Sequence, residues 1–167
     1  PDNTQIKIDR IKVLGSRQKF EASMAAAKQL VNSNPANPQF QSVYAIAKMQ
    51  LGEYAAAIEH FNKVLAILPS DSVTHTSKGH ALKTWGKNAE AIESYRSAIK
   101  SNPSYCEAYY SLANLKTYRF DDAEIEGMLA IEKNQSLTPT NVIYLYFALG
   151  KAFEDKKHWD TASNYYQ

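Results

Sequence analysis

The sequence is poor in the features that build disulfides, metal centres and membrane spans. It has one cysteine, Cys106, in 167 residues, which excludes an internal disulfide and a cysteine-rich metal site. No apolar run approaches the roughly 18 residues of a membrane span. Residues 1–10 are polar, unlike a signal peptide. These absences indicate a reducing setting, and we expect a cytoplasmic protein with no membrane partner.

The excess of one charge sign over the other is also small. The 19 Lys and Arg residues against 17 Asp and Glu residues leave a net charge of +2. A protein that binds nucleic acid usually has a clustered basic face, so we expect no nucleic-acid partner. The hydrophobic fraction of 44% is ordinary for a globular chain with a sizeable core.

Residue patterns that carry chemistry are missing as well. None of the six glycines forms a phosphate-binding loop after an expected strand. His75 and His80 are five residues apart, which does not place two metal ligands on one helical face. The acidic pair Asp121–Asp122 stands at an expected helix start, where it interacts favourably with the helix dipole. We therefore expect no catalytic, cofactor-binding or metal-binding residues in this chain, and no enzymatic activity of its own.

What the sequence does have is an internal repeat. Pro35, Pro69 and Pro103 are spaced by 34 residues, and proline separates helices because it cannot continue one. Gly52 and Gly86 keep the same spacing, and glycine tolerates the left-handed conformation that commonly ends a helix. Small residues recur midway along each expected first helix: Ala45, Gly79, Ala113 and Gly150. The period predicts one pair of helices per repeat.

Local signals mark several helix starts in the C-terminal part. The pairs with capping spacing are Asp121 with Glu124, Ser104 with Glu107, and Thr138 with Pro139. Phe120 stands where the fourth repeat should have its turn glycine. We therefore expect a fourth repeat that is less regular than the second and third.

Residues 51–61 and 86–95 resemble the tetratricopeptide repeat (TPR) family, and the resemblance covers nearly the whole chain. It implies an all-α fold: a right-handed TPR solenoid of antiparallel helix pairs, with about four and a half repeats. We expect a single domain, residues 1–167, with repeats at 4–37, 38–71, 72–105, 106–142 and an incomplete one at 143–167. A repeat array normally ends in a capping helix with a polar outer face. We therefore expect more chain downstream, and homo-oligomerisation through the uncapped last repeat.

The resemblance also implies a partner-binding surface, because in the TPR family the first helices of successive repeats line the concave face. The matching positions are Ser42, Ile46, Met49, Thr76, His80, Lys83, Tyr110, Asn114, Tyr118, Phe147 and Lys151. Tyr110 and Tyr118 are expected on one face of one helix. Aromatic anchors with a polar rim suit a protein or peptide segment. The alternative is that some of these residues only pack along the face or solvate it.

One TPR subtype does not fit. Chaperone-binding TPRs share a clamp of Lys, Asn and Arg that grips a C-terminal carboxylate. The matching positions here are Ile8, Lys12, Val43, Val73 and Ser77. A frame shifted by one repeat gives Ser42, Ile46, Ser77, Glu107 and Ser111. Apart from Lys12, neither set supplies the cations or amides that a carboxylate needs, so we do not expect this ligand.

The C-terminal part, roughly residues 106–166, resembles a narrower group. Residues 112–120 with Met128, and residues 147–155 with Trp159 and Tyr166, are similar to the last repeats of bacterial TPR–sulfotransferase proteins. In that family a downstream domain transfers a sulfuryl group from the nucleotide donor PAPS. This domain uses a phosphate-binding loop that the present sequence does not contain. The resemblance implies no cofactor for this chain, and PAPS for a domain expected beyond Gln167.

Two functions remain open. In the first, the chain is the N-terminal TPR domain of a PAPS-dependent sulfotransferase, and it recruits or orients the acceptor protein. In the second, it is a free-standing TPR adaptor with no enzymatic domain. A strand followed by a Gly- and Ser-containing phosphate loop beyond Gln167 would favour the first, and a capping helix followed by a stop would favour the second.

Overall fold

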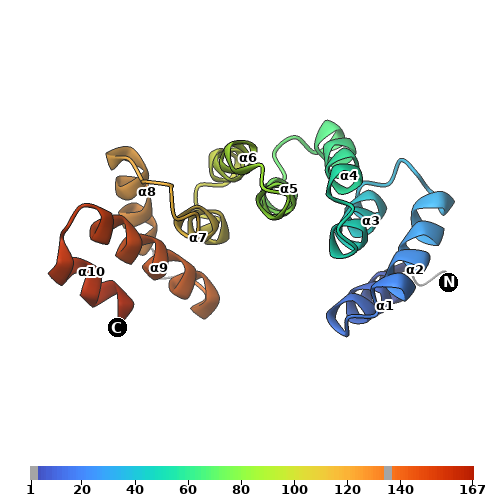
Figure 1. The fold of residues 1–167 in the computed structure, drawn as a ribbon, viewed down its shortest axis with the longest axis horizontal. Coiled ribbons are helices and arrows are strands. Elements are labelled where there is room, and N and C mark those ends of the chain that lie inside the picture. The colour runs from blue at the N-terminus through green and yellow to red at the C-terminus, as the bar shows by residue number, and fades with distance from the viewer. Residues whose placement is uncertain (1–3, 134–136) are drawn as a thin grey trace. The chain divides into compact units, whose positions relative to one another are not determined.

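The computed structural model describes residues 4–133 and 137–167, and every regular element in these ranges is an α-helix. The described helices, α1 to α10, follow one another along the chain (Figure 1). The chain divides into two compact units, residues 1–91 and residues 92–167. The boundary between them falls within α6 (Asn88–Ser101). The predicted all-α fold of paired helices is confirmed.

The N-terminal unit is a stack of helix pairs. Its complete helices are α1 (Thr4–Ser16), α2 (Phe20–Ser33), α3 (Pro38–Gln50), α4 (Tyr54–Ile67) and α5 (Ser72–Thr84). Each helix from α1 to α4 packs against the next one, α1 also packs against α3, and α3 against α5. First helices of neighbouring repeats are therefore in contact, as expected for stacked pairs.

Small residues in α3, α4 and α5 allow this close packing. Ala45 of α3, Ala57 and Phe61 of α4 and Ala81 of α5 form one buried cluster. The Phe61 ring is fully buried, with 0% of its surface exposed. Ala57 precedes it by four residues, so both lie on one face of α4, as the sequence pattern predicts.

The turn within each regular helix pair has a left-handed residue. Gly52 has a φ of +80° and Gly86 a φ of +86°, which confirms the role predicted for both glycines. Gln18 in the first repeat and Lys157 in the fifth adopt the same conformation, with φ values of 59° and 62°. This conformation is uncommon for residues other than glycine, so the repeat geometry here overrides the local preference.

The C-terminal unit contains the rest of α6 and four further helices. These are α7 (Cys106–Ala113), α8 (Asp122–Glu132), α9 (Pro139–Asp155) and α10 (Trp159–Tyr166). The long helix α9 packs against α7, α8 and α10. It begins four residues before the expected start of the fifth repeat, and each expected repeat range otherwise contains one helix pair. Within the described ranges, no helix has the length and apolarity needed to cross a membrane.

The fourth repeat departs from the pattern because α7 has only 8 residues. The chain leaves the helix at Asn114, so Tyr118 lies in the segment 114–121 rather than on α7. The prediction that Tyr110 and Tyr118 share one helical face is therefore wrong. Tyr118 and Phe120 are instead buried, with 8% and 7% exposure, and their rings meet edge to face at 5.2 Å.

Two of the predicted helix starts are confirmed. The Asp121 carboxylate accepts a hydrogen bond from the Glu124 backbone N–H (2.8 Å), and the Glu124 carboxylate accepts one from the Asp121 N–H (3.0 Å). This reciprocal pair is a capping box at the start of α8. Thr138 caps α9 through its hydroxyl, with Pro139 in the first turn.

The third predicted start is wrong. The N-cap of α7 is Tyr105, not Ser104, and no side chain caps this helix. The Glu107 carboxylate accepts a hydrogen bond from the Tyr105 hydroxyl at 2.8 Å. The one-residue shift arises because the turn at Asn102 extends to Tyr105, whose N–H bonds to the Asn102 carbonyl (3.0 Å).

Candidate partner-binding site

In the N-terminal unit, the predicted surface residues of α3 are only partly exposed. Ser42, Ile46 and Met49 are all half-buried. Ile46 and Met49 also pack against the buried cluster around Phe61. Their side chains therefore contribute to the core and leave a limited apolar surface outside it, which agrees with the alternative that some predicted residues mainly pack.

The predicted residues of α5 differ widely in exposure. Thr76 is buried, with 2% exposure, and its hydroxyl oxygen has no hydrogen-bond partner among the described residues. A buried side chain cannot contact a partner in this conformation, so Thr76 is not available as a surface residue. His80 is half-buried and Lys83 is exposed.

The C-terminal unit brings four aromatic residues into one row, the aromatic strip: Tyr144, Tyr110, Phe147 and Tyr166. The Tyr110 ring lies 4.8 Å from Tyr144 and 5.0 Å from Phe147, between ring centroids. Phe147 in turn lies 6.2 Å from Tyr166. The first three rings are half-buried, and Tyr166 is 48% exposed. Packing of α7 against α9 and of α9 against α10 holds the row together.

Glycine at position 150 allows the last ring of the strip to approach α9. A Cβ atom at Gly150 would lie 2.5 Å from the Tyr166 ring, which real side chains do not tolerate. The Tyr166 hydroxyl donates a hydrogen bond to Glu154 at 3.0 Å. The small residue expected midway along the first helix is thus required in the fifth repeat by the close approach of the Tyr166 ring.

The two polar residues predicted near the strip are occupied within the unit. The Asn114 side-chain amide donates a hydrogen bond to the Tyr110 carbonyl at 2.9 Å, at the end of α7. Lys151 pairs with Asp155 one turn further along α9. Asp155 also forms an ion pair with Arg119 at 3.3 Å. With Glu154, which accepts the Tyr166 hydroxyl, the two carboxylates balance the two cations next to the strip.

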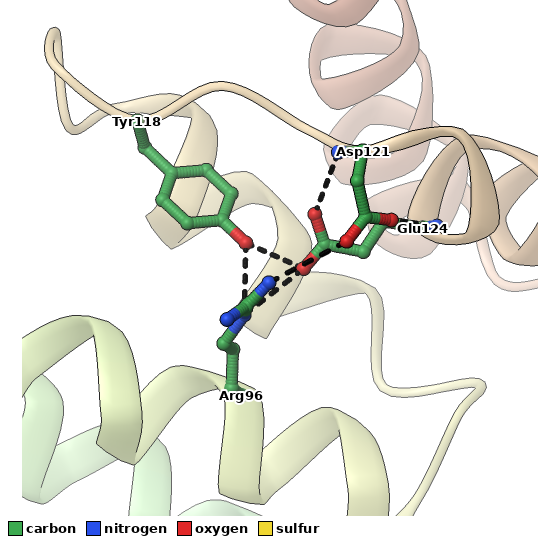
Figure 2. A network of polar contacts seen from close by, with 4 residues as sticks. All are labelled: Arg96, Tyr118, Asp121 and Glu124. Carbon is green, nitrogen blue, oxygen red and sulfur yellow. Dashed lines mark hydrogen bonds and ion pairs between the residues drawn. The ribbon is translucent and has the colours of Figure 1, made fainter.

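Tyr118 belongs to a polar network with Arg96, Asp121 and Glu124 (Figure 2). Its hydroxyl donates a hydrogen bond to Glu124 at 2.5 Å and accepts one from the Arg96 Nε at 3.1 Å. Arg96 also contacts Glu124 at 3.2 Å and Asp121 at 3.6 Å. The network joins α6, the segment 114–121 and the start of α8, so the role of Tyr118 visible here is structural.

The environment of Tyr118 disfavours its ionised form. Burial is the main cause that raises the pKa of the phenol above its usual value, and the hydrogen bond to Glu124 adds to it. The hydrogen bond from Arg96 acts in the opposite direction but is the weaker influence. Tyr118 therefore remains a neutral donor at physiological pH.

The histidine, cysteine and acidic side chains form no metal-binding cluster in the described part of the chain. Among the described residues, no three His, Cys, Asp or Glu side chains are placed to hold a metal ion. Cys106 is a free, buried thiol, and burial raises its pKa. His75 bonds to the Pro69 carbonyl at 2.9 Å, and His60 to the Gln41 side chain at 2.5 Å. These contacts give both imidazoles a structural role.

Sequence reasoning missed two members of the strip. Neither Tyr144 nor Tyr166 was among the residues predicted for the partner-binding surface. A signal for Tyr144 was available: it precedes Phe147 by three residues, which places both on one face of α9. The contribution of Tyr166 depends on how α10 packs on Gly150, which the spacing along the chain does not reveal.

Two protein-family models match the first three repeats and the first helix of the fourth. A model described as "Tetratricopeptide repeat" matches residues 8–72, and one described as "TPR repeat" matches residues 79–116. Between them they cover more than half of the chain. The chain belongs to the tetratricopeptide repeat family. It is thus a scaffold of the kind that uses stacked helix pairs for protein–protein interaction.

A curated relative and two solved structures extend this finding. The chain is 26% identical to the anaphase-promoting complex subunit 3 of Schizosaccharomyces pombe over 142 residues, which are 84% of this chain and 21% of that protein. MamA from Desulfovibrio magneticus RS-1 shares the fold with a TM-score of 0.64 at 20% identity, over 99% of this chain and 92% of that one. The second TPR domain of human RPAP3, solved with an HSP70 peptide, gives a TM-score of 0.59 at 20% identity, over 66% of this chain and 92% of that one. The TPR chain spans less than a third of the length of the curated relatives that it matches.

Proposed function

We propose that this TPR chain binds an extended segment of a partner protein, and that the aromatic strip of its C-terminal unit is the main contact. The observation that carries the proposal is the row of partly exposed rings on α7, α9 and α10. Partly exposed aromatic residues in a packed setting are the residues that dominate binding energy at protein interfaces. The RPAP3 domain, whose fold is similar, is solved with a bound peptide.

The ligand differs from the HSP70 peptide of RPAP3. In the family's carboxylate clamp, cationic and amide side chains are exposed on the first helices. Here the corresponding Ile8 and Val43 are buried apolar residues, with 1% and 6% exposure. A C-terminal carboxylate would find no charged partner at these two positions, so recognition by aromatic contact is the better match.

A peptide selection tests the proposal. The TPR chain is immobilised, peptides are selected from a random library, and the affinity of the selected peptides is measured by calorimetry. Phe147→Ala should weaken binding about tenfold or more, because it removes the central ring of the strip. Trp85→Ala is the matched control, since Trp85 is an exposed aromatic residue of the other unit (43% exposure). Equal affinity of the two variants would contradict the proposal.

The positions on α3 and α5 form a second, weaker candidate surface within the N-terminal unit. Ile46, Met49, His80 and Lys83 retain some exposure, whereas Thr76 is left out because it is buried. We expect Lys83→Ala to affect a selected peptide less than Phe147→Ala does, because an exposed lysine contributes little to binding energy.

The link to sulfation rests on sequence alone. We propose that the chain is the N-terminal domain of a bacterial, cytoplasmic, PAPS-dependent sulfotransferase, supported by the resemblance of residues 112–128 and 147–166. The test measures binding of radiolabelled PAPS to this chain and to the full-length protein. Binding by the full-length protein alone supports the proposal, and binding by neither leaves the free-standing adaptor.

Self-association through the fifth repeat stays a prediction. Ile143 and Trp159 leave 65% and 62% of their surfaces exposed there, which is favourable for a contact between copies. Sedimentation of the wild type and of Trp159→Ala would test it, since a dimer that uses this surface should dissociate in the variant.

A further inference from the structure

The tyrosine hydroxyls of the C-terminal unit differ in their partners. Tyr105, Tyr118, Tyr165 and Tyr166 donate hydrogen bonds to carboxylates, at 2.8, 2.5, 3.0 and 3.0 Å. Within the described residues, the hydroxyls of Tyr110 and Tyr144 have no such partner, although both rings are half-buried in the aromatic strip. The strip therefore combines aromatic faces with two donors that have no acceptor in the described part of the chain.

This combination favours one mode of peptide recognition over the others. The described part of the chain has no strand, so a partner cannot add a strand to a sheet edge. Beside the strip, Lys151 and Arg119 form ion pairs with Asp155, and the Glu154 carboxylate accepts a hydrogen bond from Tyr166. These two positive and two negative groups leave no net charge, so recognition of an ionic motif is not favoured. Hydroxyl donors beside aromatic faces suit a segment that presents apolar rings together with free backbone carbonyls.

We propose that the aromatic strip binds a proline-rich segment in the polyproline II conformation, an inference that rests on the proposed function. Such a segment has no internal hydrogen bonds, so its backbone carbonyls are free to accept. Aromatic-lined surfaces bind this conformation because it is already extended and loses little entropy on binding. Proline rings would lie on the faces of Tyr110 and Phe147, and the hydroxyls of Tyr110 and Tyr144 would donate to the carbonyls.

Electrical neutrality supports this partner. The strip itself contains no charged side chain, and the charged groups next to it, Lys151 and Arg119 against Asp155 and Glu154, sum to zero. A proline-rich segment has no charge that would need a counterion at the surface. Binding should accordingly depend only weakly on salt, unlike binding of a phosphorylated or acidic peptide.

The experiment uses calorimetry with a blocked polyproline peptide, a Gly–Ser peptide as the negative ligand, and the selected peptide from the test above. Tyr110→Phe combined with Tyr144→Phe keeps both rings and removes both hydroxyls, and we expect about a tenfold loss of affinity for polyproline. Tyr146→Phe is the matched control, because it removes a hydroxyl from the same helix outside the strip. Circular dichroism confirms that all variants are folded.

The outcomes separate this inference from the proposed function. Polyproline binding that falls in Phe147→Ala and in the double Phe variant, but not in Tyr146→Phe, supports the inference. No polyproline binding, with Phe147-dependent binding of the selected peptide, overturns the inference and leaves the proposed function intact. Loss of Phe147 dependence for every peptide overturns both. Polyproline binding that is unchanged in the double Phe variant also overturns the inference as stated.

Discussion

The second and fourth repeats close their helix pairs by different means. Between α3 and α4 the turn is closed by backbone hydrogen bonds, from the Gly52 N–H to Met49 and from the Glu53 N–H to Lys48, both at 3.0 Å, with an ion pair of the Lys48 and Glu53 side chains across it. Gly52 and Glu53 are exposed. Between α7 and α8 the longer segment 114–121 is held by side chains, through buried rings and the network of Figure 2. A turn that depends on one backbone angle can be predicted from one residue, whereas a turn held by side chains requires partners distant in sequence.

The largest effect should come from the ring that anchors the segment 114–121. Phe120→Ala removes a side chain that is 7% exposed and packs edge to face on Tyr118. We expect the free energy of unfolding to fall by about 3–4 kcal/mol, from lost burial and the cavity left behind. Urea denaturation followed by circular dichroism measures it.

Trp159→Ala is the control for this experiment, at a protein concentration where sedimentation shows the wild type to be monomeric, because Trp159 is an aromatic residue of the same unit that is 62% exposed. It should change the free energy of unfolding by about 0.5 kcal/mol or less. Equal effects of the two substitutions would show that the segment 114–121 is not held by its buried ring, and the contrast with the Gly52 turn would fail.

The second largest effect concerns the polar part of the same segment. Glu124→Ala leaves the hydroxyl of Tyr118 and the backbone N–H of Asp121 without their acceptor. We expect a loss of about 2 kcal/mol, the range for a partly buried, charge-assisted group whose partners become unsatisfied. Glu126→Ala, on the exposed side of the same helix, is the control and should be nearly neutral.

A double-mutant cycle sharpens this prediction. If Tyr118 and Glu124 act as one unit, combining Tyr118→Phe with Glu124→Ala should cost less than the sum of the single changes. Their coupling energy should lie at about 0.5–3 kcal/mol, as for residues in direct contact. Strict additivity would mean that the hydrogen bond between them contributes nothing to stability.

These contrasts explain how much the sequence could predict. The proline and glycine spacing predicted the helix pairs and the turns at Gly52 and Gly86, since each depends on the residue in place. The capping box of Asp121 and Glu124 was predictable because both partners lie three residues apart. The end of α7 at Ala113 was not predictable from the sequence. The segment beyond it is held by the hydrogen bond from Arg96 to Tyr118, two residues that are 22 positions apart.

The candidate site was predictable to a similar degree. The helical register placed Tyr110 and Phe147 on first helices, and the structure brings their rings together at 5.0 Å. Register could not show that Thr76 is buried, because its exposure depends on how closely neighbouring helices approach. Nor could it show that Tyr118 turns away from α7, since that requires the chain to leave the helix at Asn114.

A smaller effect is expected from the regular turn. Gly52→Ala places a Cβ atom on a residue with a φ of +80°, where no other atom lies within 4 Å. Only the backbone strain remains, so we expect a loss of about 1 kcal/mol. Gly127→Ala is the control, because Gly127 lies within α8 and its added Cβ would meet only the Tyr109 hydroxyl, at 3.5 Å. This change should be neutral or stabilising, because alanine favours a helix.

The smallest effect should have the opposite sign. Lys157 has a φ of 62° between α9 and α10, the conformation that the glycines supply in the regular turns. Lys157→Gly relieves the strain of a side chain in this region, which exceeds the entropy that glycine adds to the unfolded chain. We expect a gain of about 0.5 kcal/mol in the free energy of unfolding, measured by thermal and urea denaturation. A loss of stability would mean that contacts of the Lys157 side chain outweigh the backbone strain, and that this turn, like the segment 114–121, depends on side chains.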